Sequence, residues 1–409
     1  MPSAGLSSDG ARRLLAVLLI FLCQGTLDLS FFSVSLFMPE IQKSLALSFT
    51  QAGLLLSASS WMYALLQVPV GSLSDRRGAA PIFLAGLLGG NVVCLLFALV
   101  DAHWQAVTVQ GVFGVFRAFT FVPGMILMAQ QFPPERRTTA MGLFVSVTFV
   151  SRALLGFAGP FINDLLGWRG AFVLFPGAGL AMAGLLAVPR PAGPYRRAAS
   201  GPSASVVEVV RSPIVMLSCL IQFVRGATLF GLTSWLTTFL VDQHDMPFSE
   251  ATLLVSGSAI IIALSTPMGG YLSDRLARGL VVIAVSLVME ALLIALIGQA
   301  NAVTVVPLVL LASLFMQTYF APLFALPTQV GGIAAVGTVN GVANLLANLG
   351  GIVANYGLGR LRDATGSFEI GFWTLAAMCA FAAAALLLAA LAGYLAPGER
   401  ADVRTGGTP

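Results

Sequence analysis

The chain has 409 residues, of which 57% are hydrophobic and only 9% are charged, and its formal net charge is +4. Ordinary soluble domains carry about 25% charged residues. So few charges could not solvate the surface of a water-soluble fold. The length is sufficient for about a dozen membrane spans of ~20 residues with short connections. Composition therefore excludes a soluble domain and indicates a multi-pass membrane protein.

Apolar stretches separated by charged residues, proline and glycine predict twelve membrane-spanning helices. In chain order, the expected spans are 14–38, 51–73, 80–100, 106–130, 139–162, 168–188, 213–239, 251–273, 279–299, 303–326, 331–358 and 368–394. The first stretch follows Arg12-Arg13 as in a secretory signal, but it is too long, contains Asp28 and lacks a small-residue cleavage site. We therefore expect it to be retained as a span.

The longest segment that cannot span a membrane, 190–212, is rich in proline, serine and arginine, as flexible linkers often are. We predict an N-terminal six-helix bundle at 1–189, a cytoplasmic linker at 190–212, and a C-terminal six-helix bundle with a short cytoplasmic tail at 213–409. The expected fold class is an all-α membrane protein with twelve transmembrane helices in two pseudo-symmetric bundles.

A charged motif occurs twice, after the second span at 71–76 and after the eighth at 270–275, with an offset of 199 residues. The same offset relates three further pairs, which are Gly142 and Gly341, Asp164 and Asp363, and Gly167 and Gly366. A constant offset through most of each half indicates two fused copies of one membrane unit. Two fused membrane halves are typical of a transporter.

The basic residues outside the spans are distributed unequally between the two sides of the membrane. If the N-terminus is cytoplasmic, fourteen lie on the cytoplasmic side: Arg12, Arg13, Arg76, Arg77, Arg136, Arg137, Arg190, Arg196, Arg197, Arg211, Arg275, Arg278, Arg400 and Arg404. The opposite side holds four: Lys43, Arg169, Arg360 and Arg362. The positive-inside rule then places both termini and the linker in the cytoplasm. This bias also explains the basic pI, so we expect no nucleic-acid partner.

The first copy of the motif, Gly71-x-Leu73-x-Asp75-Arg76-x-Gly78, resembles the signature loop of the major facilitator superfamily. The second copy follows the eighth span, where that family repeats the loop, and 63–69 and 362–368 are also similar to stretches common in the family. The resemblance covers essentially the whole chain and implies alternating access. It also implies that the two loops latch an inner gate, with the gating residues Asp75, Arg76, Asp274 and Arg275. A plain alternative is that the loop arginines anchor the helices at the lipid headgroups.

Five charged residues lie near the middle of predicted spans: Asp28, Arg117, Arg152, Arg225 and Glu290. A charge at mid-span costs about 2.5–3.5 kcal/mol on insertion scales, so such residues face protein or water and are functional candidates. The family resemblance implies that the first, fourth, fifth and seventh spans line a central cavity, whereas the ninth is peripheral. Glu290 is therefore the one of the five that a structural role suits best.

Three arginines against one cavity carboxylate leave a positive site. Arginine keeps its charge and offers a fork of donors that matches a carboxylate, so we predict a small organic anion as the substrate. Arg117, Arg152 and Arg225 are predicted to bind it, together with four polar residues of the spans: Gln24, Gln222, Asn344 and Tyr319. The structural alternative pairs Asp28 with one arginine and uses the other polar groups in helix packing.

Asp28 is also the predicted proton-coupling residue, because His103 and His244 fall in outer loops and a buried carboxylate beside an arginine can exchange its proton as the substrate binds. The expected function is proton-coupled symport. The alternative is a proton-coupled exporter of drugs or metabolites, an antiporter, in which Asp28 binds cations. Gly159-Pro160 resembles the end of an antiporter motif, but Leu155 stands where that motif has glycine, which disfavours this alternative.

The sequence contains no catalytic triad pattern, metal-ligand cluster or phosphate-binding loop, so we expect neither an enzyme nor a cofactor. The four cysteines all fall within predicted spans and are interpreted as packing residues: Cys23, Cys94, Cys219 and Cys379. The expected partners are the substrate, protons and the lipid bilayer of the cytoplasmic (inner) membrane. We expect the protein to act as a monomer.

Overall fold

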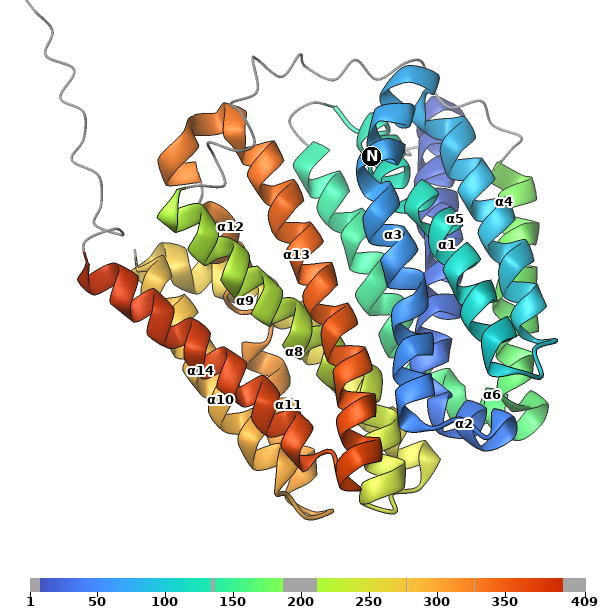
Figure 1. Ribbon diagram of the computed structural model, residues 1–409. Helices are drawn as coiled ribbons and strands as arrows, with labels where there is room; N and C mark the ends of the chain where they lie inside the picture. The colour runs from blue at the N-terminus through green and yellow to red at the C-terminus, as the bar shows by residue number, and fades with distance from the viewer. Residues whose placement is uncertain (1–7, 134–136, 187–211, 277, 327, 393–409) are drawn as a thin grey trace, which may run out of the picture.

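The computed structural model describes residues 8–133, 137–186, 212–276, 278–326 and 328–392. Within these ranges the regular secondary structure is entirely α-helical. The helices form two groups that lie side by side, the first half of the chain in blue to green and the second in yellow-green to red (Figure 1). All but one residue of the predicted linker 190–212 lies outside the described ranges, and the predicted boundaries of the two bundles stay predictions.

In the described part of the chain the first group contains six helices, and the last of them crosses the group twice. They are α1 (Ser8–Leu36), α2 (Met38–Leu45), α3 (Phe49–Arg77), α4 (Ala79–Phe97), α5 (His103–Gln130) and α6 (Arg137–Leu186). Helix α6 turns at Gly167, whose φ of 66° and ψ of 177° are accessible to glycine but strained for other residues. The fifth and sixth predicted spans are therefore the two arms of α6. Helix α2 is a short helix between the first two spans that hydropathy did not predict.

Among the described residues the second group contains seven helices, because one predicted span is broken. They are α8 (Pro213–Gln243), α9 (Phe248–Leu276), α10 (Gly279–Gly298), α11 (Val305–Phe315), α12 (Phe320–Ala325), α13 (Thr328–Thr365) and α14 (Glu369–Leu391). The tenth predicted span, 303–326, is divided between α11 and α12 by turns at 316–319. Pro322 follows the break and has no N–H to donate to the carbonyl of Thr318, which disfavours a continuous helix.

Nine helical segments of the described chain are long and apolar enough to cross a membrane. One of them, Leu143–Leu186, includes the turn at Gly167 and provides two crossings. Helices α3 and α13 are long enough to span but more polar than the others. With the second crossing of α6 and these two helices, the twelve predicted spans are all present. The predicted all-α membrane fold with two groups of six spans is confirmed.

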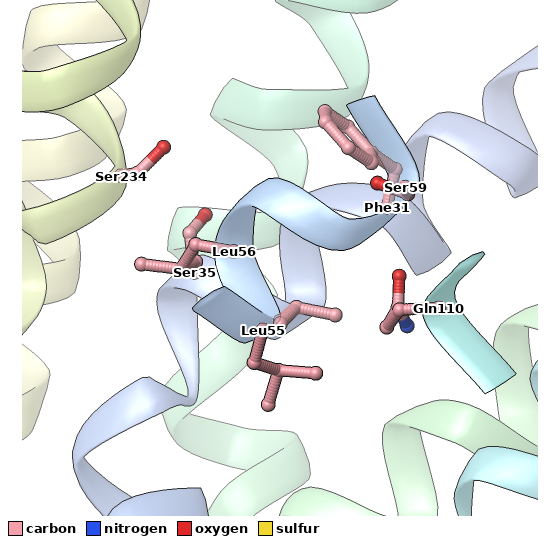
Figure 2. A pocket seen from close by; sticks show the side chains of 8 residues that line it. Phe31, Ser35, Leu55, Leu56, Ser59, Gln110 and Ser234 are labelled. Atoms are coloured by element: carbon pink, nitrogen blue, oxygen red, sulfur yellow. The ribbon is translucent and has the colours of Figure 1, made fainter. Parts of the chain in front are cut away.

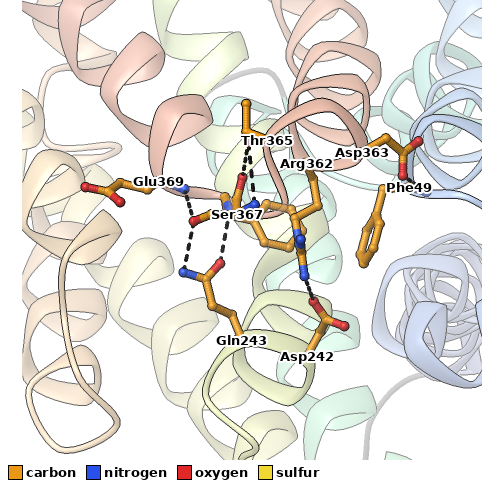
Figure 3. A network of polar contacts seen from close by, with 9 residues as sticks. Phe49, Asp242, Gln243, Arg362, Asp363, Thr365, Ser367 and Glu369 are labelled. Atoms are coloured by element: carbon orange, nitrogen blue, oxygen red, sulfur yellow. Dashed lines mark hydrogen bonds and ion pairs between the residues drawn. The ribbon is translucent and has the colours of Figure 1, made fainter.

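The two halves are joined at the end of the molecule where α1 ends at Leu36 and α3 begins at Phe49, which we call the outer end. The carboxylate of Asp363, near the end of α13, accepts hydrogen bonds from the backbone N–H groups of Phe49 (2.9 Å) and Thr50 (2.7 Å) in α3. These N–H groups have no partner within their own helix. Asp363 therefore closes the start of a helix in the opposite half (Figure 3).

Asp363 is an exposed residue at the end of its helix, and its ionisation is tied to this contact. Partial burial opposes ionisation, but hydrogen bonds from the side chain and backbone of Thr50, the backbone of Phe49 and the side chain of Ser48 outweigh it and lower the pKa of Asp363. The contact between the halves is therefore strongest while this carboxyl is ionised.

Further contacts between the halves continue inward from Asp363. Gly53 of α3 lies against the backbone of Asn355 in α13, where a side chain would collide with the carbonyl oxygen. The hydroxyl of Ser57, one turn further along α3, donates to the carbonyl of Ile352 at 3.2 Å. On the other pair of helices, the hydroxyl of Ser256 in α9 donates to the carbonyl of Ala153 in α6 at 3.1 Å. The two halves are thus closed against each other on the outer side.

Aromatic residues and a polar network seal the outer end around α13. Arg362 forms an ion pair with Asp242 at 2.7 Å, and its guanidinium group lies 4.8 Å from the ring of Phe49 in the other half. The side chain of Gln243 accepts a hydrogen bond from the backbone N–H of Phe368 at 3.0 Å (Figure 3). These contacts fix the ends of α8, α13 and α14 relative to α3.

Candidate functional site

A cavity of about 240 Å³ lies between the two halves, on the inner side of the closed outer end. Its polar lining residues are Asp28, Tyr63, Arg117, Thr148, Arg152, Arg225, Thr266 and Gln317. Six phenylalanines complete much of the wall: Phe31, Phe32, Phe121, Phe149, Phe230 and Phe320. The four charged residues predicted for a central cavity are thus brought together, from α1, α5, α6 and α8.

Asp28 is the carboxylate of this cavity, and only 2% of its surface is exposed. The amide of Gln24, one turn earlier in α1, donates to Oδ1 at 3.1 Å, and the hydroxyl of Thr148 in α6 donates to Oδ2 at 3.0 Å. Arg117 acts on it electrostatically, but no ion pair involving Asp28 occurs among the described residues. Asp28 therefore accepts hydrogen bonds from two neutral side chains and forms no ion pair with a described arginine.

Arg117 is held by aromatic rings, and its guanidinium group makes no hydrogen bond to another described residue. Its guanidinium carbon lies 3.7 Å from the centre of the Phe31 ring and 4.6 Å from the centre of the Tyr63 ring. Such cation–π contacts stabilise the charge by about 0.5–2 kcal/mol and leave the N–H groups available. An arginine side chain has five N–H donors, and those of Arg117 have no acceptor within the described part of the chain.

Arg152 connects the two halves through the cavity. From α6 it donates one hydrogen bond to the backbone carbonyl of Thr233 in α8, at 2.7 Å. Its guanidinium carbon also lies 5.1 Å from the ring centre of Phe32. One donor is thus used in the contact between halves, and the remaining donors are available to a solute.

Arg225 of α8 is the most buried of the three arginines, with 5% of its surface exposed. Its Nε donates to Oε1 of Gln222 at 2.7 Å, and one terminal nitrogen donates to Oε1 of Gln317 at 3.1 Å. The ring of Phe320 lies 5.0 Å from its guanidinium carbon. Both hydrogen-bond partners are neutral amides, so the positive charge of Arg225 is oriented but not cancelled by them.

None of the three guanidinium groups forms an ion pair with a carboxylate in the described part of the chain. Burying a charge without a counter-charge is costly. A carboxylate-bearing solute that accepts bidentate hydrogen bonds from these groups would supply the missing negative charge. Three arginines and one carboxylate among its lining residues thus give the cavity a net positive charge when all four are ionised.

Four other predicted substrate-binding residues do not line the cavity. Gln24 and Gln222 hold Asp28 and Arg225 in place through the hydrogen bonds described above. Tyr319 is fully buried and donates to Glu290 at 3.0 Å. The amide of Asn344 donates to Oε1 of Gln67 in α3 at 3.2 Å, another contact between the halves.

Sequence reasoning did not single out Thr148, Thr266 and Gln317, which contribute polar atoms to the cavity. Thr148 lies one helical turn before Arg152, so the i, i+4 spacing could have placed it on the same face. Gln317 lies in the broken part of the tenth span, where the helical period no longer predicts a direction. Thr266 stands on α9 without a charged neighbour that would mark its face.

The predicted gating residues lie near the inner ends of α3 and α9. Arg76 and Arg275 are exposed, while the side chains of Asp75 and Asp274 fall outside the described part of the structure. Their role in an inner gate stays a prediction.

A second, smaller cavity of about 20 Å³ lies next to the first, and Phe31 lines both (Figure 2). It is lined by Phe31, Val34, Ser35, Leu55, Leu56, Ser59, Gln110 and Ser234. Its volume suits about one water molecule. The amide nitrogen of Gln110 is buried there with no hydrogen-bond partner in the described chain, as expected of a group that binds water. The ring of Phe31 therefore separates the main cavity from a small polar space.

Comparison with known proteins identifies the family. The model of the Major Facilitator Superfamily matches residues 20–355. A hexuronate transporter of Bacillus subtilis (strain 168) is 25% identical, over 92% of this chain and 94% of that protein. A D-galactonate transporter of Escherichia coli O6:H1 is 22% identical, over 88% of this chain and 91% of that protein.

The fold is also similar to a solved structure. A bacterial homolog of the human lysosomal transporter Spinster, in an inward-facing and occupied conformation, superimposes with a TM-score of 0.80 at 17% sequence identity, covering 93% of this chain and 97% of that chain. With a family model that matches most of its length and a fold of twelve spans, this chain belongs to the Major Facilitator Superfamily and is a membrane transporter, not an enzyme.

Proposed function

We propose that the protein is a secondary active transporter that moves a small organic anion across the cytoplasmic membrane by alternating access, in symport with protons. The observation that carries this proposal is the set of three cavity arginines with no carboxylate partner among the described residues. With Asp28 ionised, three arginines and one carboxylate leave the cavity at a net charge of +2. A monoanion lowers this charge and accepts the unused N–H groups.

The proposed substrate class is a sugar acid or a similar hydroxylated carboxylate. Two relatives carry a hexuronate and D-galactonate, as their names state. Such solutes combine one carboxylate with several hydroxyl groups. Beside the arginines, the cavity offers hydrogen-bond partners for these hydroxyl groups in Tyr63, Thr148 and Gln317. The phenylalanine rings would pack against the C–H faces of the solute.

Asp28 is the proposed proton site of the cavity. Protonation removes its negative charge and raises the net charge around the arginines, so the anion binds more strongly when Asp28 is protonated. The anion and the proton therefore favour each other's binding, which is the requirement for symport. The neutral donors Gln24 and Thr148 hold the carboxyl in place while its charge changes.

The closed outer end defines the state from which transport proceeds. We propose that the two halves rock about the cavity, so that the contacts between α3 and α13 open when the inner side closes. A cytoplasmic location of both termini, with the inner end facing the cytoplasm, fits the arginines near that end. We propose a monomer as the transporting unit, since each chain has its own cavity.

A thermal-unfolding assay of the purified protein tests the substrate class. D-Glucuronate and D-galactonate should raise the melting temperature, whereas neutral D-glucose and cationic D-glucosamine should not. A ligand at ~100 times its Kd stabilises the folded protein by about 2.7 kcal/mol. Stabilisation by cations alone would favour the alternative of a proton-coupled exporter and would refute the anion site.

Substitutions of single arginines locate the site. Arg117→Gln, Arg152→Gln and Arg225→Gln should each weaken anion binding by about 30-fold, corresponding to a loss of about 2 kcal/mol for one member of a buried charge pair. Lys43→Gln removes the same charge from an exposed position in α2, where the side chain is 70% exposed, and should leave affinity unchanged. Equal effects of all four substitutions would point to a general electrostatic field rather than a site.

Uptake into proteoliposomes tests proton coupling. An inward proton gradient should drive accumulation of labelled D-galactonate in the wild type. Asp28→Asn should retain exchange of internal for external substrate and lose gradient-driven accumulation. Accumulation by Asp28→Asn equal to that of the wild type would remove Asp28 from the coupling mechanism.

A further inference from the structure

Glu290 is a second buried carboxyl group that the cavity does not explain. It lies in the middle of α10, has no exposed surface, and does not line the cavity. Its Oε2 accepts a hydrogen bond from the hydroxyl of Tyr319 at 3.0 Å. Its Oε1 has no hydrogen-bond partner in the described chain. A permanently ionised carboxylate in this position would leave a charged oxygen buried and unsatisfied, which is costly.

The surroundings of Glu290 contain features that favour its ionised form and features that favour its neutral form. Tyr319, in the turn between α11 and α12, donates to it, and Arg225 of α8 acts on it electrostatically. Both favour the ionised form. Thr228 of α8 is a third polar neighbour of the carboxyl, and its hydroxyl donates to the carbonyl of Arg225 at 3.2 Å. Complete burial and the unpaired Oε1 favour the neutral form instead. The remaining titratable neighbour is Cys379 of α14, a buried thiol.

The broken segment between α11 and α12 connects Glu290 to the cavity. Gln317 lines the cavity and accepts a hydrogen bond from Arg225, and Phe320 lines it against the same guanidinium group. Tyr319, between them in sequence, is directed instead to Glu290. One turn of irregular backbone at mid-membrane therefore carries contacts to Arg225 on one side and to Glu290 on the other.

We propose that Glu290 is a second proton-binding site of the transporter, which regulates anion binding at Arg225. When the Glu290 carboxylate is ionised, its negative charge offsets the charge of Arg225. When a proton from solution binds to a carboxylate oxygen, the group becomes a neutral carboxyl and Arg225 is left without a counter-charge. The anion then binds to Arg225, and its release accompanies the return of the proton to solution. This role for Glu290 rests on the proposed function of Arg225 in anion binding.

Each half of the protein would then contain one carboxyl group and one arginine that act together. In the first half Asp28 and Arg117 both line the cavity, whereas in the second half Arg225 lines it and Glu290 lies behind Tyr319. Two linked protons predict an anion affinity that falls more steeply with pH than one carboxyl alone would produce.

Infrared difference spectroscopy of the ligand-free protein tests proton binding directly. Between about pH 5 and about pH 9, across the range in which perturbed carboxyls titrate, the wild type should lose a carbonyl-stretch band of a protonated carboxyl that is absent from Glu290→Gln at every pH. A Glu290 band that persists across this range would show a permanently protonated group and overturn the proposal. Identical spectra of the wild type and Glu290→Gln would show a permanently ionised group and overturn it as well. Glu250→Gln, at an exposed position in α9, is the matched control and should match the wild type.

Tyr319→Phe provides a second variant if Glu290→Gln does not fold. It keeps the ring and Glu290 but removes the hydroxyl of Tyr319, which donates to the carboxylate at 3.0 Å. The titration of the Glu290 band should therefore move to higher pH. An unchanged titration in Tyr319→Phe would contradict the arrangement proposed for the carboxyl.

Anion binding tests the regulatory part of the proposal. The affinity of the wild type for D-galactonate should fall with rising pH, and Glu290→Gln should remove about a tenfold change per pH unit from that dependence, the effect of one linked proton. An identical pH dependence in the two proteins would overturn the coupling to Arg225. If neither D-galactonate nor D-glucuronate binds the wild type, the proposed substrate class fails, while the ligand-free titration still decides whether Glu290 binds a proton.

Discussion

Asp363→Asn should open the outer end of the transporter more often. The substitution removes the negative charge and one of the two oxygens that accept the N–H groups of Phe49 and Thr50. A charge at a helix N-terminus stabilises it by about 0.3–1 kcal/mol, and the loss of a capping side chain costs about 0.5–2 kcal/mol. Because Asp363 is exposed, we take about 1 kcal/mol for the whole contact. The ratio of open to closed outer ends should then rise about fivefold.

Distances between spin labels or fluorophores at the outer end measure this ratio. Lys43→Cys in α2 and Glu250→Cys in α9 place exposed labelling sites on opposite halves. The four native cysteines are buried, so the introduced thiols would react first. Asp164→Asn is the matched control. Asp164 is the repeat equivalent of Asp363 and is also exposed, but it makes no hydrogen bond or ion pair in the described structure. Equal distance distributions in wild type and Asp363→Asn, or an equal shift in Asp164→Asn, would refute the reasoning.

Acid should act in the same direction as Asp363→Asn. The closed contact lowers the pKa of Asp363 from its ordinary value of 3.8, so its stabilisation is complete above that value and is lost as the pH falls through the lowered pKa. The labelled wild type should therefore open its outer end on acidification, whereas the labelled Asp363→Asn protein should show no corresponding transition. Phe31→Ala should join the two cavities, because the Phe31 ring lines both, and a structure of the variant should show one continuous cavity that reaches the amide of Gln110. Gly53→Leu should weaken the closed outer end, because its side chain would collide with the backbone of Asn355, and the same label distances would report the opening.

Hydropathy predicted the twelve spans, because a segment in lipid must satisfy its own backbone and therefore forms helix over about 20 residues. It did not predict the break at 316–319, because the polar residues Gln317 and Thr318 there also occur within continuous spans and do not by themselves indicate a break. The signal available was Pro322, which removes a helical hydrogen bond but does not fix where the helix separates. The sequence did not predict helix α2, because its eight residues are too few to show a clear helical period of hydrophobic residues.

The charged part of the site was predictable because ionisable residues are rare and costly within spans. The uncharged residues of the site were harder to predict, since many spans contain threonine and glutamine at positions where they only pack against other helices. The i, i+4 and i, i+3 spacings put Gln24 beside Asp28 and Gln222 beside Arg225 on one helix face. It could not tell that each glutamine would bind its charged neighbour, because that depends on rotamers and on helices remote in sequence. Tyr319 shows the same limit, since the broken helix directs it to Glu290 instead of the cavity.

The positive charge of the empty cavity also predicts tight coupling. When the halves close over the cavity, its charges lose contact with water, and the cost rises with the net charge that remains uncompensated. A protonated but empty transporter would carry three uncompensated arginines, so it should reorient more slowly than one that holds an anion. This would suppress proton leak without substrate.

Arg152→Gln tests that argument, because it removes one cavity charge and the hydrogen bond to Thr233. Proton entry into proteoliposomes without any anion, followed with an internal pH-sensitive dye, should increase by about tenfold for each ~1.4 kcal/mol removed from the barrier. The exposed Lys43→Gln variant should leak at the wild-type rate. A leak in Arg152→Gln no greater than in the wild type would mean that the net charge of the empty cavity does not limit its closure, and coupling would then have to depend on the contacts between the halves.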